Sequence, residues 1–335
     1  MKPYLSIIIP YHNSSETIER LLLSITRSKK APSYEVIVVD DGSSPSLSFR
    51  KPVPPGRWPK DSFQVKDGMT MRIVRFDRNH GPAVARNRGV AKARGEFVVF
   101  LDSDVELFGD TLANIAKIYH DDPDIVALTG VWVKEQKSRA FFPNFKALRD
   151  WSYWINERDK SGYYFLFSTR IASIKRSVFL RLGGFDETYP APLVEDIELT
   201  YRIARRYAII FAPNVRVRHE FESFWPIAKK YFLRAYYWTK LYQRRKKFDP
   251  VATTWQEAVT TISGVGVVFF APISLISPIG QIGLTTALVL HLFLIRKFLI
   301  FLYQERGMVF ATRGFFVGLV LYCFIFTGAL LGRIR

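Results

Sequence analysis

The sequence predicts an α/β fold, with a mostly parallel central sheet and flanking helices, followed by an interfacial helix and carboxy-terminal membrane helices. Two observations support this prediction: short apolar runs alternate with helical patterns through the first part of the chain, and the chain becomes overwhelmingly apolar after residue 258. Strands that alternate with helices form βαβ units, which build a parallel sheet with right-handed crossovers. We therefore expect an α/β domain at residues 1–222, a basic aromatic interfacial helix and linker at 223–257, and a membrane domain at 258–335.

The composition favours anionic partners. The chain has 335 residues, and its 48 Lys and Arg against 30 Asp and Glu give a formal charge of +18, which suits nucleic acid, an anionic membrane surface or a phosphorylated substrate. One cysteine, Cys323, excludes an intrachain disulfide. The first apolar run ends at Pro10 after only a few residues, so we interpret it as a strand, not a signal peptide, and expect the amino-terminal domain in the cytoplasm.

The first hundred residues predict strands and helices in alternation. Buried β-branched runs predict strands at residues 5–9, 35–39, 71–76 and 97–101, and apolar residues on one helical face predict helices at 16–26 and 83–93. Residues 45–70 are rich in Pro, Ser and Lys and have no periodicity, which predicts a long exposed loop. Ligands of such sheets bind beyond the carboxyl ends of the strands, and two acidic clusters fall there, Asp40 with Asp41 and Asp102 with Asp104.

The next hundred residues continue the pattern. They predict helices at 110–120 and from 195 to about 206, a strand at 125–133, and a strand followed by a short helix within 171–182. Aromatic residues between 139 and 164 are interpreted as core, with a binding platform as the alternative. The acidic pair Glu195 and Asp196 opens a helix, where it serves either as a cap favoured by the helix dipole or in catalysis.

The stretch FVVFLDSDVEL, residues 97–107, ends a buried strand with two carboxylates. In an extended backbone Asp102 and Asp104 point the same way and together hold a divalent cation, whereas the same residues in a solvated turn need no ligand. This stretch alone leaves both interpretations open. Arg86 lies in the first turns of a helix, where it can meet phosphate, and Arg88 is assigned to a solvated helix face.

The last part of the chain predicts a membrane attachment. Residues 223–247 alternate aromatic and basic side chains, as in a helix that lies among lipid headgroups, although nucleic acid is a rival partner. Apolar segments at 259–276, 279–295 and 308–331 are each long enough to span a bilayer. If residues 293–303 lie along the interface instead, two spans replace three. Flanking Arg and Lys residues place the amino-terminal domain in the cytosol by the positive-inside rule.

Six motifs in order resemble the family 2 inverting glycosyltransferases of the GT-A type, here with a carboxy-terminal membrane anchor. They are SIIIPYHN, VIVVDDGSS, NHGPAVARNRGV, FLDSDVEL, IKRSVFLRLGGFDE and EDIELTYR, and they cover residues 6–201. The resemblance implies the GT-A fold, which is Rossmann-like with a mostly parallel sheet.

The resemblance also implies roles on the donor side. A nucleotide sugar would be bound by Pro10, Tyr11, Asp40, Asp41, Arg86, Asp102 and Ser103. The cofactor would be Mg²⁺ or Mn²⁺, held by Asp104 and Asp102 of the family's Asp-x-Asp motif and by His219. Such an ion neutralises the diphosphate leaving group.

On the acceptor side, the resemblance implies that Asp196, next to Glu195, is the general base that deprotonates the acceptor hydroxyl. Gly183 and Gly184 would let the backbone pass close beneath the acceptor.

Three departures from the family pattern bear on the nucleotide site and on the classes of enzyme and acceptor that we expect. A proline-rich segment after Ser44 replaces a short connection beside the nucleotide site. The processive synthases' Gln-x-x-Arg-Trp motif is missing, with Gln243 to Arg245 the nearest approach, which argues against that class. VELFGDTL after the acidic motif differs from the LQHPPE-type sequence of dolichol-phosphate mannose synthases, so a bare polyprenyl phosphate is a less favoured acceptor.

We therefore expect a hexosyltransferase-like, inverting enzyme in the inner membrane, multi-pass, with its catalytic domain in the cytoplasm. It would move one sugar from a UDP-, GDP- or dTDP-linked donor to a lipid-linked or membrane-proximal glycan acceptor, and no nucleic-acid partner is expected. The alternative is a polyprenyl-phosphate glycosyltransferase. A non-catalytic membrane scaffold or nucleic-acid-binding protein is less favoured, because the acidic set and the apolar tail are both intact.

Overall fold

The computed structural model describes residues 2–47, 62–65, 69–157, 164–189, 193–248 and 254–334, with residues 62–65 and 69–70 described by their backbone. The chain divides into two compact units: unit 1 is Met1–Glu135 with Lys160–Glu220, and unit 2 is Gln136–Asp159 with Phe221–Arg335. This division differs from the expected three parts. Residues 136–159 join the carboxy-terminal helices, and the basic aromatic segment belongs to the same unit as the apolar helices.

Unit 1 contains a mixed sheet. Its strands are β1 (Leu5–Tyr11), β2 (Tyr34–Asp41), β3 (Ser62–Val65), β4 (Met69–Phe76), β5 (Phe97–Leu101), β6 (Val105–Leu107), β7 (Ala127–Trp132), β8 (Ile171–Lys175) and β9 (Ile210–His219). Within the described residues their order is β3-β4-β2-β1-β5-β8-β7-β9-β6. Strands β4, β2, β1 and β5 are parallel, while β8 runs antiparallel to both β5 and β7. The expected α/β class is confirmed, and the expected parallel pairing is found among β4, β2, β1 and β5.

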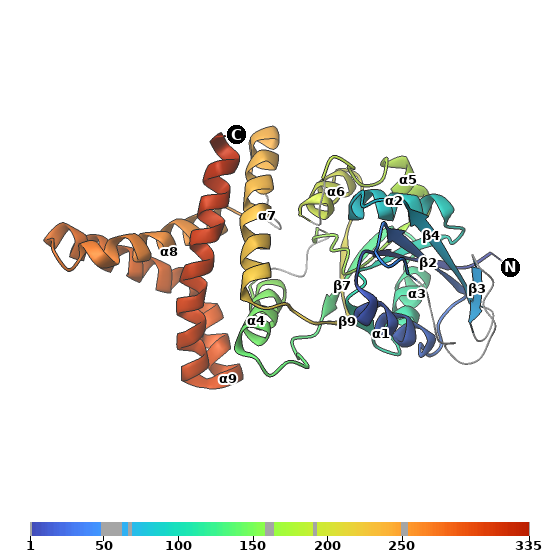
Figure 1. The fold of residues 1–335 in the computed structure, drawn as a ribbon, viewed down its shortest axis with the longest axis horizontal. Coiled ribbons are helices and arrows are strands. Elements are labelled where there is room, and N and C mark those ends of the chain that lie inside the picture. The colour runs from blue at the N-terminus through green and yellow to red at the C-terminus, as the bar shows by residue number, and fades with distance from the viewer. Residues whose placement is uncertain are drawn as a thin grey trace. The chain divides into compact units, whose positions relative to one another are not determined.

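Helices cover both faces of this sheet. They are α1 (Ser15–Thr26), α2 (Pro82–Lys92), α3 (Thr111–Asp121), α5 (Arg176–Arg181) and α6 (Glu195–Ala204). Figure 1 shows α1 and α3 on one face of the sheet and α2 and α5 on the other. The crossover through α1 leads from β1 to β2 and the crossover through α2 leads from β4 to β5, which run in opposite directions across the sheet. The chain therefore reverses its direction of winding at β1 and β5, the place where such sheets bind ligands.

Strands β1, β2 and β4 are longer than the sequence indicated, β7 is shorter, and β3 lies in an unexpected place. β1 and β2 extend to Tyr11 and Asp41 because parallel pairing continues there, with Tyr11 opposite Asp40. The expected loop at 45–70 is wrong in part, since β3 lies within it and pairs antiparallel with β4. The sequence of a short edge strand gives only a weak signal for a strand. Residues 48–61 and 66–68 of that loop lie outside the described residues.

Unit 2 consists of helices. They are α4 (Phe141–Ile155), α7 (Phe224–Arg245), α8 (Trp255–Ile273) and α9 (Pro278–Ile334), and α9 is interrupted at Gly307. A buried aromatic and aliphatic cluster joins α4, α7 and α9 through side chains such as Phe145, Ile227 and Leu302. The core interpretation of the aromatic stretch is thus confirmed for Phe142, Phe145 and Trp151, while Tyr163 lies outside the described residues.

The apolar helices of unit 2 run in two directions. Figure 1 shows α8 and the first part of α9 as a hairpin, and the last part of α9 beside α7. A Cβ added to Gly328 would lie 2.1 Å from the Phe232 carbonyl oxygen, so these two helices touch at their backbones. Within the described residues, α8 and α9 are the two helices long and apolar enough to cross a membrane, by length and composition.

Candidate active site

Many of the site residues predicted from the sequence lie at the carboxyl ends of β1, β2 and β5. Pro10 and Tyr11 end β1, Asp40 and Asp41 end β2, and Asp102 follows β5. The apolar strands require this arrangement, because their β-branched interiors are fully buried and polar side chains begin where the sheet reaches solvent.

Asp40 and Asp41 are buried and fix the loops around them. Asp40 accepts hydrogen bonds from the backbone N–H groups of Ser43 (3.1 Å) and Leu47 (2.8 Å). The Asp41 carboxylate accepts from the N–H groups of His80 (2.7 Å) and Gly81 (2.8 Å), just before α2. These contacts fix the chain after β2 and the chain before α2 around the two carboxylates.

Tyr11 lies beside Asp40 in the sheet register and is buried, whereas Pro10 is half-buried. Burial, and then the negative charge of Asp40, raise the pKa of the Tyr11 hydroxyl above its ordinary value. The hydroxyl therefore stays protonated and can act as a hydrogen-bond donor.

Asp102 and Asp104 point to different partners. Asp102 Oδ1 accepts a hydrogen bond from Arg86 Nη2 at 2.7 Å, while Asp104 Oδ2 lies 3.3 Å from His219 Nε2. The expected extended backbone is wrong at this point: the chain turns here, with the Val105 N–H donating to the Asp102 carbonyl, and Ser103 lies half-buried in that turn. His219 reaches Asp104 because β6 and β9 pair with Val105 opposite His219.

A divalent cation fits this geometry only if its other ligands come from substrate. In the part of the chain that the structure describes, no group of three His, Cys, Asp or Glu side chains is arranged to hold a metal ion. Asp104 and His219 could supply two ligands, and Asp102 is turned toward Arg86. Mg²⁺ and its close relatives commonly take one or two protein ligands and complete their shell with phosphate oxygens and water.

Arg86 is fully buried and joins the two acidic motifs. Its Nη1 donates to Glu195 Oε1 at 2.8 Å, and its Nη2 donates to Asp102 Oδ1 at 2.7 Å. Burial alone lowers the pKa of the Arg86 guanidinium, but the charges of Asp102 and Glu195 and their hydrogen bonds outweigh it, and the pKa is raised. Arg86 is therefore a permanent cation within the site, and Arg88 is exposed as the sequence indicated.

Glu195 and Asp196 have different environments at the start of α6. Glu195 is buried, and its second oxygen, Oε2, accepts a hydrogen bond from the Leu193 N–H at 2.8 Å. Asp196 is half-buried, and its Oδ1 accepts from the Ile197 N–H at 2.8 Å. Both Glu195 oxygens are thus committed to protein donors, and Asp196 is the member of the pair that reaches the surface.

The glycine pair forms a turn held by α2. Gly183 and Gly184 have φ of 84° and 72°, the left-handed region that favours glycine. A Cβ added to Gly184 would lie 2.5 Å from Asn87 Oδ1, whereas nothing lies within 4 Å of one added to Gly183. Asn87 donates to the Phe185 carbonyl at 2.9 Å and accepts from the Phe185 N–H at 2.8 Å.

Sequence reasoning missed Asn87 and Phe185. Asn87 lies in the NHGPAVARNRGV motif directly after Arg86, and the glycine pair indicated a close backbone approach without naming its partner. Phe185 packs under the guanidinium, with Arg86 Cζ 5.5 Å from its ring centre. Asn87 and Phe185 are 98 residues apart, so no local sequence pattern predicts their contact.

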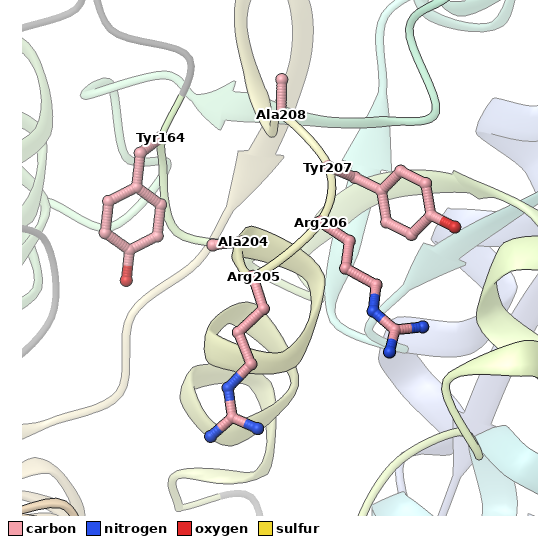
Figure 2. A pocket seen from close by; sticks show the side chains of 6 residues that line it. All are labelled: Tyr164, Ala204, Arg205, Arg206, Tyr207 and Ala208. Carbon is pink, nitrogen blue, oxygen red and sulfur yellow. The ribbon is translucent and has the colours of Figure 1, made fainter.

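A separate surface hollow of about 370 Å³ lies at the other end of α6 (Figure 2). It is lined by Tyr164, Ala204, Arg205, Arg206, Tyr207 and Ala208. None of these residues belongs to the acidic motifs, so this hollow is distinct from the candidate site.

Comparison with known proteins assigns the larger part of unit 1 to one family. Residues 6–179 match the family described as glycosyl transferase family 2. The uncharacterized glycosyltransferase YfnE of Bacillus subtilis is 31% identical over 128 residues, which are 38% of this chain and 30% of that protein. The aligned part thus covers about a third of that relative's length.

Two further relatives extend the match. The glucosyl-dolichyl phosphate glucuronosyltransferase of Haloferax volcanii is 24% identical over 247 residues, 64% of this chain and 70% of that protein. A solved structure, the mannosyltransferase PcManGT from Pyrobaculum calidifontis in complex with GDP-Man and Mn²⁺, has a TM-score of 0.56 and 18% identity, and the match covers 99% of this chain and 88% of that one. This likeness supports the GT-A fold.

Proposed function

Because the chain belongs to glycosyl transferase family 2, we propose that it is a membrane-anchored, metal-dependent, inverting enzyme that transfers one sugar from a nucleotide-sugar donor. The acceptor would be a lipid-linked or membrane-proximal glycan. The observation that best supports this proposal is the buried Arg86, which links Asp102 of the donor-side motif to Glu195 of the acceptor-side pair at 2.7 and 2.8 Å. One connected site thus contains both halves of a transferase.

The donor would lie at the carboxyl edge of the parallel strands. Tyr11, Asp40 and Asp41 would surround the base and ribose, and Ser103 would lie near the diphosphate. Asp104 and His219 would hold Mg²⁺ or Mn²⁺, which when bound supplies positive charge to the diphosphate leaving group. The donor is a UDP-, GDP- or dTDP-sugar.

Asp196 would take the acceptor proton. The acceptor hydroxyl oxygen forms a bond to the anomeric carbon while the bond from that carbon to the nucleoside diphosphate breaks on the opposite face, so the configuration inverts. The hydroxyl proton passes to the Asp196 carboxylate, which lies half-buried in the first turn of α6. Glu195 is unsuited to this task because Arg86 and the Leu193 N–H occupy its two oxygens.

The apolar helices support a membrane attachment. α8 and α9 have the length and composition of membrane spans, and basic residues such as Arg296 and Lys297 would lie at the cytosolic surface. The catalytic unit would then face the cytosol at the inner membrane. One relative is named for a lipid-linked sugar, glucosyl-dolichyl phosphate, which agrees with an acceptor that arrives from the bilayer.

The replacement Asp196→Asn tests the general base. General-base catalysis contributes roughly 10²- to 10⁴-fold, so we expect transfer to a hydroxyl acceptor to fall by that factor, with binding of the nucleotide sugar unchanged in calorimetry. Glu198→Gln is the matched control, because Glu198 lies on the same helix and pairs with Arg202 instead. Full activity of Asp196→Asn on a sugar hydroxyl contradicts the assignment.

The same variant separates the proposal from the polyprenyl-phosphate alternative. A phosphate acceptor is already ionised and needs no base, so Asp196→Asn would stay active on polyprenyl phosphate. If wild type transfers sugar only to the phosphate, the alternative replaces our proposal. Binding of RNA in preference to nucleoside diphosphates would instead favour a non-catalytic protein.

A further inference from the structure

We infer that α2 holds the acceptor side of the site in register with the donor side, and that Arg86 and Asn87 are the positioning residues that do so. This inference rests on the proposed function and deepens it. It assigns Arg86 to the geometry of the site, in place of the diphosphate contact that the family resemblance implied, and it gives Asn87 a role for the first time.

Arg86 connects three segments that are far apart in the sequence. Its two carboxylate partners, Asp102 and Glu195, are 16 and 109 residues away, and the Phe185 ring lies below its guanidinium. Both terminal nitrogens are used by these carboxylates, and only 1% of Arg86 is exposed. A planar guanidinium can serve two carboxylates at fixed angles, whereas a Lys ammonium is a point charge and cannot reproduce that fork.

The contact between Arg86 and Glu195 also determines the position of Asp196, the proposed general base. Glu195 is locked between Arg86 Nη1 and the Leu193 N–H, so the first turn of α6 is fixed at this point. Asp196 is the next residue, and its direction depends on that turn. Loss of Arg86 leaves the buried Glu195 carboxylate and the half-buried Asp102 carboxylate without their shared cation, and their repulsion would move the start of α6.

Asn87 fixes the adjoining acceptor-side loop. Its amide makes three hydrogen bonds, with the Phe185 carbonyl, the Phe185 N–H and Glu187 Oε1, at 2.9, 2.8 and 2.8 Å. Gly184 permits this approach, since a Cβ there would meet Asn87 Oδ1 at 2.5 Å. The side chain's oxygen and nitrogen are both committed to the loop, which suits positioning better than contact with substrate.

The first test compares Arg86→Lys, Glu195→Gln and the double variant, with Arg88→Lys as the matched control on the exposed face of α2. A misplacement of about 1 Å costs about 10²-fold in rate, so we expect kcat to fall by about that factor in each single variant. Metal-dependent binding of the nucleoside diphosphate should change less than about threefold, and the double variant should be no slower than the worse single one.

Two results would overturn the role of Arg86. An increase in the dissociation constant of the nucleoside diphosphate with unchanged kcat would make Arg86 a diphosphate ligand. Unchanged kcat per folded molecule, with a lower Tm alone, would make its contacts merely structural. Additive losses in the double variant would likewise show that Arg86 and Glu195 do not act through one another.

The second test uses Asn87→Ala, Gly184→Ala and their combination. Each single change breaks or crowds the same contact, so we expect each to lower kcat and raise the KM for the acceptor while the KM for the donor stays constant. In the combination the Asn87 side chain is gone and no longer meets the new Cβ, while the strain of alanine at the positive φ of residue 184 remains, so the combined loss should be smaller than the sum of the two single losses. Additive losses, or a changed donor KM alone, would contradict the inference.

Hydrogen exchange distinguishes failure of this inference from failure of the proposed function. The Phe185 and Leu193 amides donate to Asn87 and Glu195, so they should exchange faster in Asn87→Ala and Arg86→Lys respectively, at temperatures far below Tm. If these amides exchange faster in the variants but the wild type transfers no sugar, the contacts of Arg86 and Asn87 are supported and the proposed glycosyl transfer is rejected. Unchanged exchange and kcat in an active enzyme would reject the positioning role.

Discussion

At the scale of single residues, the charged residues of the candidate site fall into two sets by burial. Asp40, Asp41, Arg86 and Glu195 are all at most 3% exposed and bonded to protein, while Asp102, Asp104 and Asp196 are half-buried. The first set keeps the loops and motifs in place. The residues proposed as metal ligand and general base, Asp104 and Asp196, belong to the second set.

The metal role of Asp104 is testable at this scale. Asp104→Ala removes a ligand, so we expect Mn²⁺-dependent affinity for the nucleoside diphosphate to fall at least about tenfold, or ~1.4 kcal/mol, in calorimetry. The measurement is repeated with EDTA, which should lower wild-type affinity to the level of the variant. Asp121→Ala is the control, because Asp121 is an exposed carboxylate paired with Lys117. Affinity that neither EDTA nor the substitution changes would disprove metal dependence.

At the scale of elements, two helices organise the molecule. The Gly81 N–H at the start of α2 donates to Asp41, and two side chains of α2, Arg86 and Asn87, donate to Glu195 and to the Phe185 carbonyl. α7 carries basic and aromatic side chains together, as where Lys240 lies 4.6 Å from the Tyr236 ring. One face of α7 packs in the cluster with α4 and α9, which leaves other side chains such as Lys229 and Arg244 exposed.

Charge on α7 should govern attachment to anionic lipid. Each Lys or Arg near an anionic surface contributes about 1 kcal/mol, so replacing Lys229, Lys240 and Arg244 with Gln should cost about 3 kcal/mol. We expect the rate in nanodiscs rich in phosphatidylglycerol to fall to the level seen in phosphatidylcholine. The control replaces Arg88, Lys92 and Lys117 with Gln, which changes net charge equally on unit 1. Equal losses from both sets would indicate a general charge effect, not an interfacial helix.

At the scale of the whole molecule, contacts within unit 2 bear on the expected number of membrane spans. The last part of α9 touches α7 at Gly328 and at Gly332, where added Cβ atoms would lie 2.1 and 2.4 Å from carbonyl oxygens of Phe232 and Tyr236. Such contact lets two helices run side by side over their length. If α7 lies in the headgroup region, the segment after Gly307 lies there with it, and only the hairpin of α8 and the first part of α9 crosses the bilayer.

The position of the carboxy terminus distinguishes the two topologies. Two spans return the chain to the cytosolic side, whereas three leave its end on the opposite side. We expect a fluorescent protein fused to the carboxy terminus to be bright, because it matures in the cytosol, and an alkaline phosphatase fused there to be inactive. An active phosphatase would support the topology with three spans. The same reporters fused before Met1 provide the reference for the cytosolic side.

The sequence by itself determined the α/β class, the alternation of strands and helices, and the six motifs, because each depends on local periodicity or short spacing. Its expectation of α2, β5 and α6 was confirmed within a few residues. Only the tertiary structure decided that Asp102 and Asp104 diverge, that Arg86 bridges two motifs and that Asn87 holds the loop at Gly184. Those contacts join segments that are distant in the chain. The partners of a buried charged side chain depend on which segments the fold brings together, and no local pattern predicts this.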